Sequence, residues 1–123
     1  MTKEILVAVS DMIFSSKINA VASQININLT FVKSLDKLLQ QANNLTPKLI
    51  ILDLNNPRFD PIAAIQQLKT TENLTLIPII GFLSHTQVEL RRQAESSGCD
   101  LVMPRSQFTN NLVDILNGTY VNA

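Results

Sequence analysis

LIILD, at residues 49–53, is the stretch of sequence that decides the fold, because four large apolar side chains are followed there by one carboxylate. A short, unbroken apolar run of this kind is typical of a central strand in a parallel sheet that helices cover on both faces. Asp53 then lies at the carboxyl end of the strand, the edge where open α/β sheets bind ligands. Alternatively, Asp53 only opens the turn that follows, as aspartate often does.

Length, charge and cysteine content limit the classes of function. The 123 residues suit one domain, which we expect at 1–118 with a C-terminal tail at 119–123. Ten basic residues balance ten acidic ones, so we expect no direct contact with nucleic acid or an anionic membrane surface. Cys99, the single cysteine, is expected to be buried in a reducing compartment. Because no stretch reads as a signal peptide or a membrane span, we expect a soluble, cytoplasmic protein.

Hydrophobic periodicity predicts strands that alternate with helices along the chain. Strand patterns occur at residues 5–9, 27–31, 49–53, 77–83 and 101–103. Helical patterns occur between and after them, at 12–24, from 35 to the Asn43-Asn44 pair, from Pro61 to Thr71, from a capping-box sequence at Thr86 to Gly98, and as one last helix between Ser106 and Gly118.

The strand patterns differ in the burial that they predict. Residues 27–31 alternate apolar and polar side chains, which suits an edge strand, whereas the strands at 5–9, 49–53 and 77–83 read as interior. This ranking predicts an α/β fold of the flavodoxin-like kind, with a doubly wound, five-stranded parallel sheet in the order 2-1-3-4-5 and three αβα layers. In that order the first and third strands end side by side, so Asp11 and Asp53 are expected to converge.

These residues resemble the receiver domain of two-component response regulators, and the resemblance covers nearly the whole chain. Asp53 stands where that family carries its phosphoacceptor aspartate, and Asn55 and Pro57 match the D-x-N-x-P loop that follows it. Ser10 and Asp11 stand at the position of the family's acidic pair. The resemblance implies a CheY-like fold and a role in signal transduction rather than an enzyme with a substrate of its own.

The resemblance also implies a magnesium site. Receivers bind Mg²⁺ through one carboxylate of the acidic pair, the acceptor aspartate and a backbone carbonyl two residues later, which here are Asp11, Asp53 and the carbonyl of Asn55. Ser10 replaces the other acid of the pair. It can hold a metal-bound water but adds no charge, so we expect weak binding of Mg²⁺ at most.

Three further positions depart from the family pattern. The switch hydroxyl falls on Leu83 when the chain is aligned without a gap, and Ser84 can replace it only if the fourth strand shifts by one residue. The family's lysine position falls on Arg105, or on Met103 if the fifth strand slides by two residues. Arginine keeps the charge, but its planar fork differs from a compact ammonium group. The switch aromatic is replaced by Val102.

Two interpretations follow, and we favour the first. In the first, the chain is a pseudo-receiver, an atypical signal-transduction module that acts through protein–protein interaction with impaired phosphorylation. In the second, it accepts a phosphoryl group on Asp53 with the help of Mg²⁺, Arg105 and Ser84. A hydrolase or reductase on the same fold is disfavoured, because the sequence has neither a glycine-rich phosphate loop nor a nucleophile elbow.

The partners implied by the resemblance are proteins, such as a histidine kinase or an output protein. Receivers usually meet partners or a second copy through the fourth helix, the fifth strand and the last helix. We therefore expect docking or a homodimer there, through residues such as Leu90, Arg91, Arg105 and Phe108. Two nearby side chains stay outside this hypothesis: His85 reads as a surface or capping residue, and Phe59 either makes an exposed contact or folds onto the core.

Overall fold

Five parallel strands form one sheet in the computed structural model, which describes residues 4–120. Their order is β2-β1-β3-β4-β5, which confirms the predicted flavodoxin-like sheet. The strands are β1 (Ile5–Ala8), β2 (Leu29–Phe31), β3 (Leu49–Asp53), β4 (Ile79–Leu83) and β5 (Leu101–Pro104).

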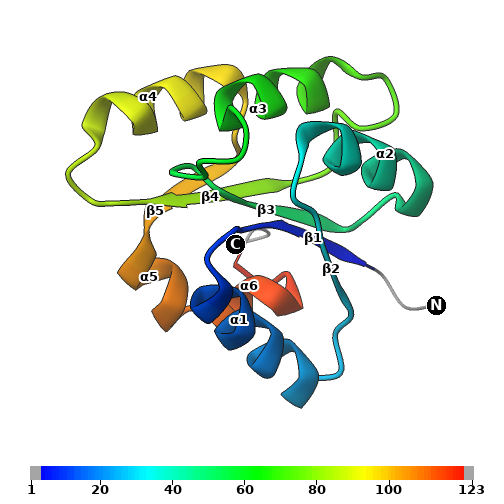
Figure 1. Cartoon of the computed structure of the whole chain (residues 1–123), viewed down its shortest axis with the longest axis vertical. Helices are drawn as coiled ribbons and strands as arrows, with labels where there is room; N and C mark the ends of the chain where they lie inside the picture. Colours follow the sequence, from blue (N-terminus) through cyan, green and yellow to red (C-terminus); the bar gives the residue numbers. More distant parts are fainter. Residues whose placement is uncertain (1–3, 121–123) are drawn as a thin grey trace.

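Helices cover both faces of the sheet and complete the three layers (Figure 1). One face carries α2 (Leu35–Leu45), α3 (Pro61–Thr70) and α4 (Val88–Ser97), and the other carries α1 (Met12–Gln24), α5 (Arg105–Asn110) and α6 (Leu112–Asn117). Every residue of β1, β3 and β4 is buried between these layers, whereas β2 is half exposed at the edge, as predicted. Two hydrophobic clusters, one on each face, form the core.

Side-chain caps fix where the first three helices begin. The Asp11 carboxylate accepts hydrogen bonds from the amides of Ile13 and Phe14, and Ser34 and Asp60 cap α2 and α3 in the same way. Such caps satisfy backbone N–H groups that have no partner within the helix. The predicted bounds 12–24 of the first helix are confirmed, and Asp11 is thereby held at its N-terminus.

Several predicted boundaries are wrong by one or two residues. β1 ends before Val9, β2 begins two residues late at Leu29 and β4 begins at Ile79, while β5 extends to Pro104. The second helix continues through the Asn43-Asn44 pair to Leu45 and ends at Thr46 in a left-handed conformation. A helix commonly ends at a residue in the left-handed conformation, and here that residue is Thr46 rather than one of the two asparagines.

The capping box predicted at Thr86 does not form. The N-cap position of α4 is Gln87, and no side chain caps this helix. The Thr86 hydroxyl instead lies 3.3 Å from the hydroxyl of Ser84. The C-terminal cap of this helix is confirmed, because Gly98 adopts φ 113°, which is strained for any other residue.

The last helix is split, contrary to the prediction of one helix after Ser106. α5 begins at Arg105, two residues earlier than predicted and directly after Pro104, and a break at Asn111 separates it from α6. The amide side chain of Asn111 donates to the carbonyl of Gln107 at 2.9 Å. The same carbonyl also accepts the backbone amide of Asn111 at 3.1 Å. Local side-chain bonds of this kind favour departures from regular helix, and here the break occurs without a proline or glycine.

Three side chains, those of Phe59, Phe108 and Cys99, test the burial predicted for them. Phe59 folds onto the core, which resolves the alternative left open by the sequence. Phe108 is fully buried, so it is wrongly predicted as a surface contact. Cys99 is buried, as predicted.

In the predicted tail, Tyr120 packs partly against the core, and residues 121–123 lie outside the described residues. No helix within residues 4–120 has both the length and the apolar character needed to cross a membrane.

Candidate functional site

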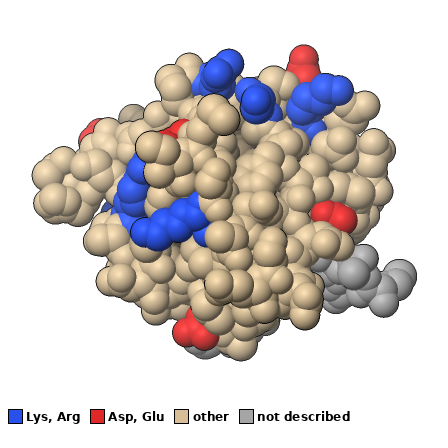
Figure 2. Space-filling view, turned by 60° about the horizontal axis from the view of Figure 1, so that its bottom comes forward, with Lys and Arg blue, Asp and Glu red and all other residues tan. Residues whose placement is uncertain are grey.

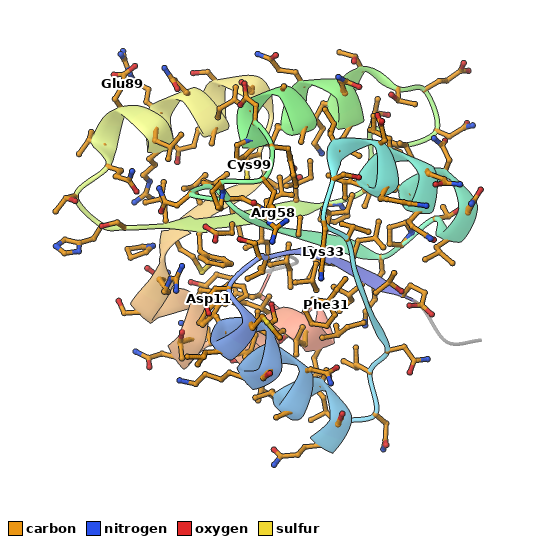
Figure 3. The ribbon with its side chains drawn as sticks, viewed as in Figure 1. Asp11, Phe31, Lys33, Arg58, Glu89 and Cys99 are labelled. Carbon is orange, nitrogen blue, oxygen red and sulfur yellow. The ribbon has the colours of Figure 1, made fainter. Side chains whose placement is uncertain are left out.

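Two carboxylates meet at the carboxyl edge of the sheet. Asp53 is the last residue of β3, and Asp11 follows the neighbouring strand β1 at the first turn of α1 (Figure 3). Parallel neighbouring strands end at the same edge, so the order of the sheet brings these side chains together. Asp53 is 4 % exposed, whereas the Asp11 side chain remains accessible.

The guanidinium of Arg105 lies between the two carboxylates. Its Nη1 is 3.6 Å from Oδ2 of Asp11, and its Nη2 is 3.8 Å from Oδ2 of Asp53. Met103, the alternative for the family's lysine position, is 2 % exposed and belongs to the hydrophobic core. The side chain from β5 and α5 that reaches the acidic pair is therefore that of Arg105.

The guanidinium of this arginine lies over two aromatic rings. The guanidinium carbon lies 4.6 Å from the ring centroid of Phe14 and 5.3 Å from that of Phe82. The two rings pack edge to face against each other with centroids 5.1 Å apart. A cation over an aromatic face is attracted by the electron density of the ring. The aromatic platform, as we call Phe14 and Phe82, thus holds the charge of Arg105 at the acidic pair.

The second oxygen of each carboxylate binds backbone N–H groups. Oδ1 of Asp53 accepts a hydrogen bond from the amide of Asn55 at 2.9 Å. Oδ1 of Asp11 accepts from the amides of Ile13 and Phe14 at 2.9 and 3.1 Å. Each carboxylate therefore has one oxygen fixed by the backbone and the other turned toward Arg105.

The two acids have opposite pKa shifts. Hydrogen bonds from the amides of Phe14 and Ile13, together with the nearby charge of Arg105, lower the pKa of Asp11. Burial raises the pKa of Asp53, and the charge of Asp11 adds to this effect, against the lowering action of the Asn55 amide and Arg105. Opposite shifts of neighbouring titratable groups are typical of functional sites.

The side chain of Asn55 joins the two loops beside the acidic pair. Its amide nitrogen donates to Oε1 of Gln87 at 2.6 Å, and its Oδ1 accepts from the backbone amide of Ser84 at 3.2 Å. The predicted role of Asn55 was that of a backbone carbonyl ligand in the loop after Asp53, and no role was predicted for the side chain of Gln87. Ser84 thus reaches the site through its backbone, while its hydroxyl faces Thr86.

Asn56 also positions the site, and the sequence analysis missed it. This side chain is 7 % exposed. It donates to the carbonyl of Ala8 at 3.1 Å and accepts from the amide of Arg58 at 2.8 Å. It thereby ties the loop after Asp53 to the end of β1. The polar segment after LIILD was the available signal, but a polar loop residue is more often exposed than buried.

The residues present do not fit a divalent cation as the side chains lie. Mg²⁺ prefers six oxygen ligands in octahedral geometry, and the carboxylate oxygens that face each other are both paired with Arg105. Ser10, the predicted water-mediated ligand, is only half buried and adds no charge. Within residues 4–120, no three His, Cys, Asp or Glu side chains gather closely enough to hold a metal ion.

An open groove of about 760 Å³ lies beside Arg105. Its lining combines apolar side chains, those of Phe14, Leu83 and Pro104, with polar ones and with the two cations Lys17 and Arg105, and it includes no carboxylate from the described part of the chain. On the face of the molecule that Figure 2 shows, Lys and Arg side chains form small groups separated by surface without basic residues. The groove therefore suits a small acidic feature rather than a long polyanion.

Comparison with known proteins identifies the fold. No protein-family model matches the sequence, and no curated protein matches it significantly. Among solved structures, a putative response regulator from Chloroflexus aurantiacus J-10-fl has a TM-score of 0.85 at 14 % identity, with 100 % of both chains covered.

Two further solved structures are similar. The chemotaxis response regulator CheY4 of Vibrio cholerae has a TM-score of 0.82 at 13 % identity, over 97 % of this chain and 99 % of that one. The receiver domain of the sensor histidine kinase PA1611 from Pseudomonas aeruginosa PAO1, solved with a magnesium ion in its active-site cleft, has a TM-score of 0.83 at 19 % identity, with both chains fully covered. The fold of this chain is therefore that of response regulator receiver domains.

Proposed function

We propose that this chain is a receiver-like signal-transduction module of a two-component or phosphorelay-type system, which acts in the cytoplasm by binding a partner protein. In this proposal phosphorylation of Asp53 is impaired and the chain is a pseudo-receiver rather than an enzyme. The observation that carries the proposal is the position of the Arg105 guanidinium, 3.6 Å from Asp11 and 3.8 Å from Asp53.

Phosphoryl transfer to a carboxylate requires positive charge around the phosphoryl oxygens and an acceptor oxygen that is free to attack. Here Oδ1 of Asp53 is bound to a backbone amide, and its Oδ2 is paired with Arg105. Ser10 removes one carboxylate from the expected metal ligands. Loss of that charge and the partners already present at both acceptor oxygens, an amide hydrogen bond and an ion pair at 3.8 Å, disfavour the reaction.

The response to a phosphoryl group is impaired as well. Leu83, at the family's switch position, is 2 % exposed and apolar, so it offers no hydroxyl. The hydroxyl of Ser84 faces Thr86. Neither residue supplies the hydrogen bond to a phosphoryl oxygen by which receivers report phosphorylation, so the module is proposed to signal by constitutive binding.

The proposed partner is a protein such as a histidine kinase or an output protein, or a second copy of this chain. The surface of α4, β5 and α5 is the proposed interface, with Val88, which is 74 % exposed, and Arg91 as contact residues. Leu90 contributes less, because it packs partly against the core. The groove beside Arg105 adjoins this surface, and Lys17 in its lining is suited to pair with an acidic side chain of the partner.

The competing function is that of a phosphorylation-competent receiver that uses Mg²⁺ and Asp53. Asp53 does end β3 beside an acid and a cation, which favours this alternative. A solved structure with the same fold, that of the cyanobacterial phytochrome response regulator RcpA, is described as phosphorylated, at 19 % identity and with a TM-score of 0.79.

Phosphodonor treatment distinguishes the two functions. The chain and an Asp53→Asn variant are incubated with Mg²⁺ and acetyl phosphate, or with beryllofluoride, and followed by intact mass and by amide NMR spectra. A phosphorylation-competent receiver from another protein serves as the positive control. The proposal predicts no added mass and identical responses of the two proteins. A phosphoryl adduct that the Asp53→Asn variant lacks would establish the competing function.

A further inference from the structure

We infer that the guanidinium of Arg105 takes the place of a divalent cation at the acidic pair of Asp11 and Asp53, so that this site works without a metal ion. The inference deepens the proposed function, since it names the cation of the same site. It rests on that proposal only in treating the acidic pair as the site, and its test needs no phosphodonor.

The first argument is the arrangement of the carboxylate oxygens. Both carboxylates turn Oδ2 toward one guanidinium, and different nitrogens of that group meet them. A planar guanidinium carries several N–H donors in a fixed fork and can bridge two carboxylates in this way. The place between two converging acids, where a metal ion reduces their repulsion, is thus taken by a side chain of the same chain.

The second argument is what holds Arg105 in place. Its guanidinium lies over both rings of the aromatic platform, at 4.6 Å from Phe14 and 5.3 Å from Phe82. Its backbone begins α5 directly after Pro104, and its carbonyl accepts a hydrogen bond from the Thr109 hydroxyl. Arg105 is therefore held from its backbone to its charged end and does not act as a loose surface charge.

The third argument is charge balance. One guanidinium opposite two carboxylates leaves one net negative charge, if both acids are ionised. Because Ser10 adds no carboxylate, a monovalent guanidinium leaves the site with no more than that one negative charge.

A titration with Mn²⁺ and Mg²⁺ tests the inference. Binding is followed by electron paramagnetic resonance of Mn²⁺ and by calorimetry for Mg²⁺, on the wild type, Arg105→Gln and Arg105→Ala. Gln keeps a side chain that can pack on the aromatic platform, so it provides a folded variant if Ala does not. Circular dichroism and thermal unfolding verify the fold. Arg92→Ala, which removes an equal charge from an exposed position, is the matched control.

We expect the wild type and Arg92→Ala to show no saturable binding up to about 1 mM Mn²⁺, the range of weak cation sites in proteins. We expect Arg105→Gln to bind Mn²⁺ at least about tenfold more tightly, because the facing oxygens then lack a counter-ion. Adding Asp11→Asn or Asp53→Asn to this variant should abolish the gain, which assigns the ion to the acidic pair.

Two results would overturn the inference. One is a wild type that binds Mn²⁺ as tightly as Arg105→Gln and loses it in Asp53→Asn. The other is a folded Arg105→Gln variant that binds no more tightly than Arg92→Ala. Metal binding by a wild type that accepts no phosphoryl group would contradict this inference alone, whereas a phosphoryl adduct on Asp53 would contradict the proposed function.

Discussion

The guanidinium carbon of Arg105 lies 4.6 Å from the centroid of the Phe14 ring. This contact joins the start of α5 to the first turn of α1, whose N-cap is Asp11. Phe14 in turn meets Phe82 of β4 and lies tilted against Phe108 of α5, with ring centroids 5.9 Å apart. The charge at the acidic pair and the aromatic part of the core are therefore physically coupled.

The first prediction concerns that coupling. In a double-mutant cycle, Phe14→Leu and Arg105→Gln should show a coupling free energy of about 0.5–1 kcal/mol, since each variant removes the same cation–π contact. Urea unfolding of the wild type, both single variants and the double variant measures it. Ile18→Val on the same helix, which is buried, replaces Phe14→Leu in the control cycle and should be additive with Arg105→Gln. Additivity in both cycles would contradict the coupling.

The second prediction concerns the charge of Asp53. Its pKa is raised by burial above the ordinary value of 3.8, so the folded state binds the proton more tightly than the unfolded chain. The stability contributed by this group is present below pH 3.8 and is lost as the pH rises through the folded pKa. At neutral pH, Asp53→Asn should therefore have a higher free energy of unfolding than the wild type.

The measurement is urea unfolding of wild type and Asp53→Asn from neutral to acidic pH. The advantage of the variant should shrink below pH 3.8, where the carboxyl group is protonated in both states. Glu72→Gln, at an exposed position, is the control and should stay within about 0.5 kcal/mol of the wild type. An Asp53→Asn variant that is less stable at neutral pH would mean that the pairing with Arg105 outweighs burial.

The third prediction concerns Lys69 in the last turn of α3, whose side chain is the centre of a small polar network. Its Nζ donates to the carbonyls of Thr75 and Ile77 and to Oδ2 of Asp100, at 3.2, 3.1 and 2.9 Å. The same Asp100 oxygen accepts from the amide of Ile79. The Lys69 side chain is only 18 % exposed, whereas that of Asp100 is 41 % exposed. On removal of Lys69, access to water is therefore limited at the part-buried carbonyls of Thr75 and Ile77 and not at Asp100.

Lys69→Met should lower the free energy of unfolding by about 2–3 kcal/mol, because several partly buried polar groups lose a charged donor. Arg92→Met is the matched control, because the Arg92 side chain, which forms an ion pair with Glu89, is 72 % exposed. That pair should contribute less than about 1 kcal/mol. Chemical denaturation compares the two variants, and equal losses would refute the distinction between them.

The fold was predictable because its signals are local. Apolar runs such as 49–53 identify buried strands, and the alternating pattern at 27–31 identifies the edge strand, so the order of the sheet follows. The break at Asn111 was not predictable, because a side chain that bonds a backbone carbonyl of its own helix leaves no periodic signal. The same holds at Thr86, where a contact with Ser84 replaces the expected cap.

The candidate site was predictable only in its carboxylates. Asp11 and Asp53 converge because of strand order, which the hydrophobic pattern determines. The choice between Arg105 and Met103 depended on where β5 ends, and the sequence left that open by two residues. The roles of Asn56 and Gln87 depend on contacts between loops that are distant in the sequence, which no local pattern encodes.

The last prediction concerns Gly81 of β4, which packs closely against Leu54 in the loop after Asp53. A Cβ atom added to Gly81 would lie 2.9 Å from Cδ1, 3.0 Å from Cγ and 3.1 Å from Cδ2 of Leu54. Leu54 is 3 % exposed, so its side chain has little room to move away. Gly81→Ala should therefore cost about 1–3 kcal/mol through overpacking, although alanine suits a strand at least as well as glycine.

A double-mutant cycle with Leu54→Ala separates this clash from other effects of the added methyl group. Leu54→Ala alone should cost about 2–5 kcal/mol, because it leaves a cavity in the core. In the double variant the new methyl group of residue 81 fills part of that cavity, so the total loss should be smaller than the sum of the single losses. Urea unfolding measures all four proteins. Because Leu54 lies between Asp53 and Asn55, the Gly81→Ala variant should also shift the amide NMR signals of both neighbours. Additive losses with unshifted signals would place the cost of Gly81→Ala elsewhere in β4.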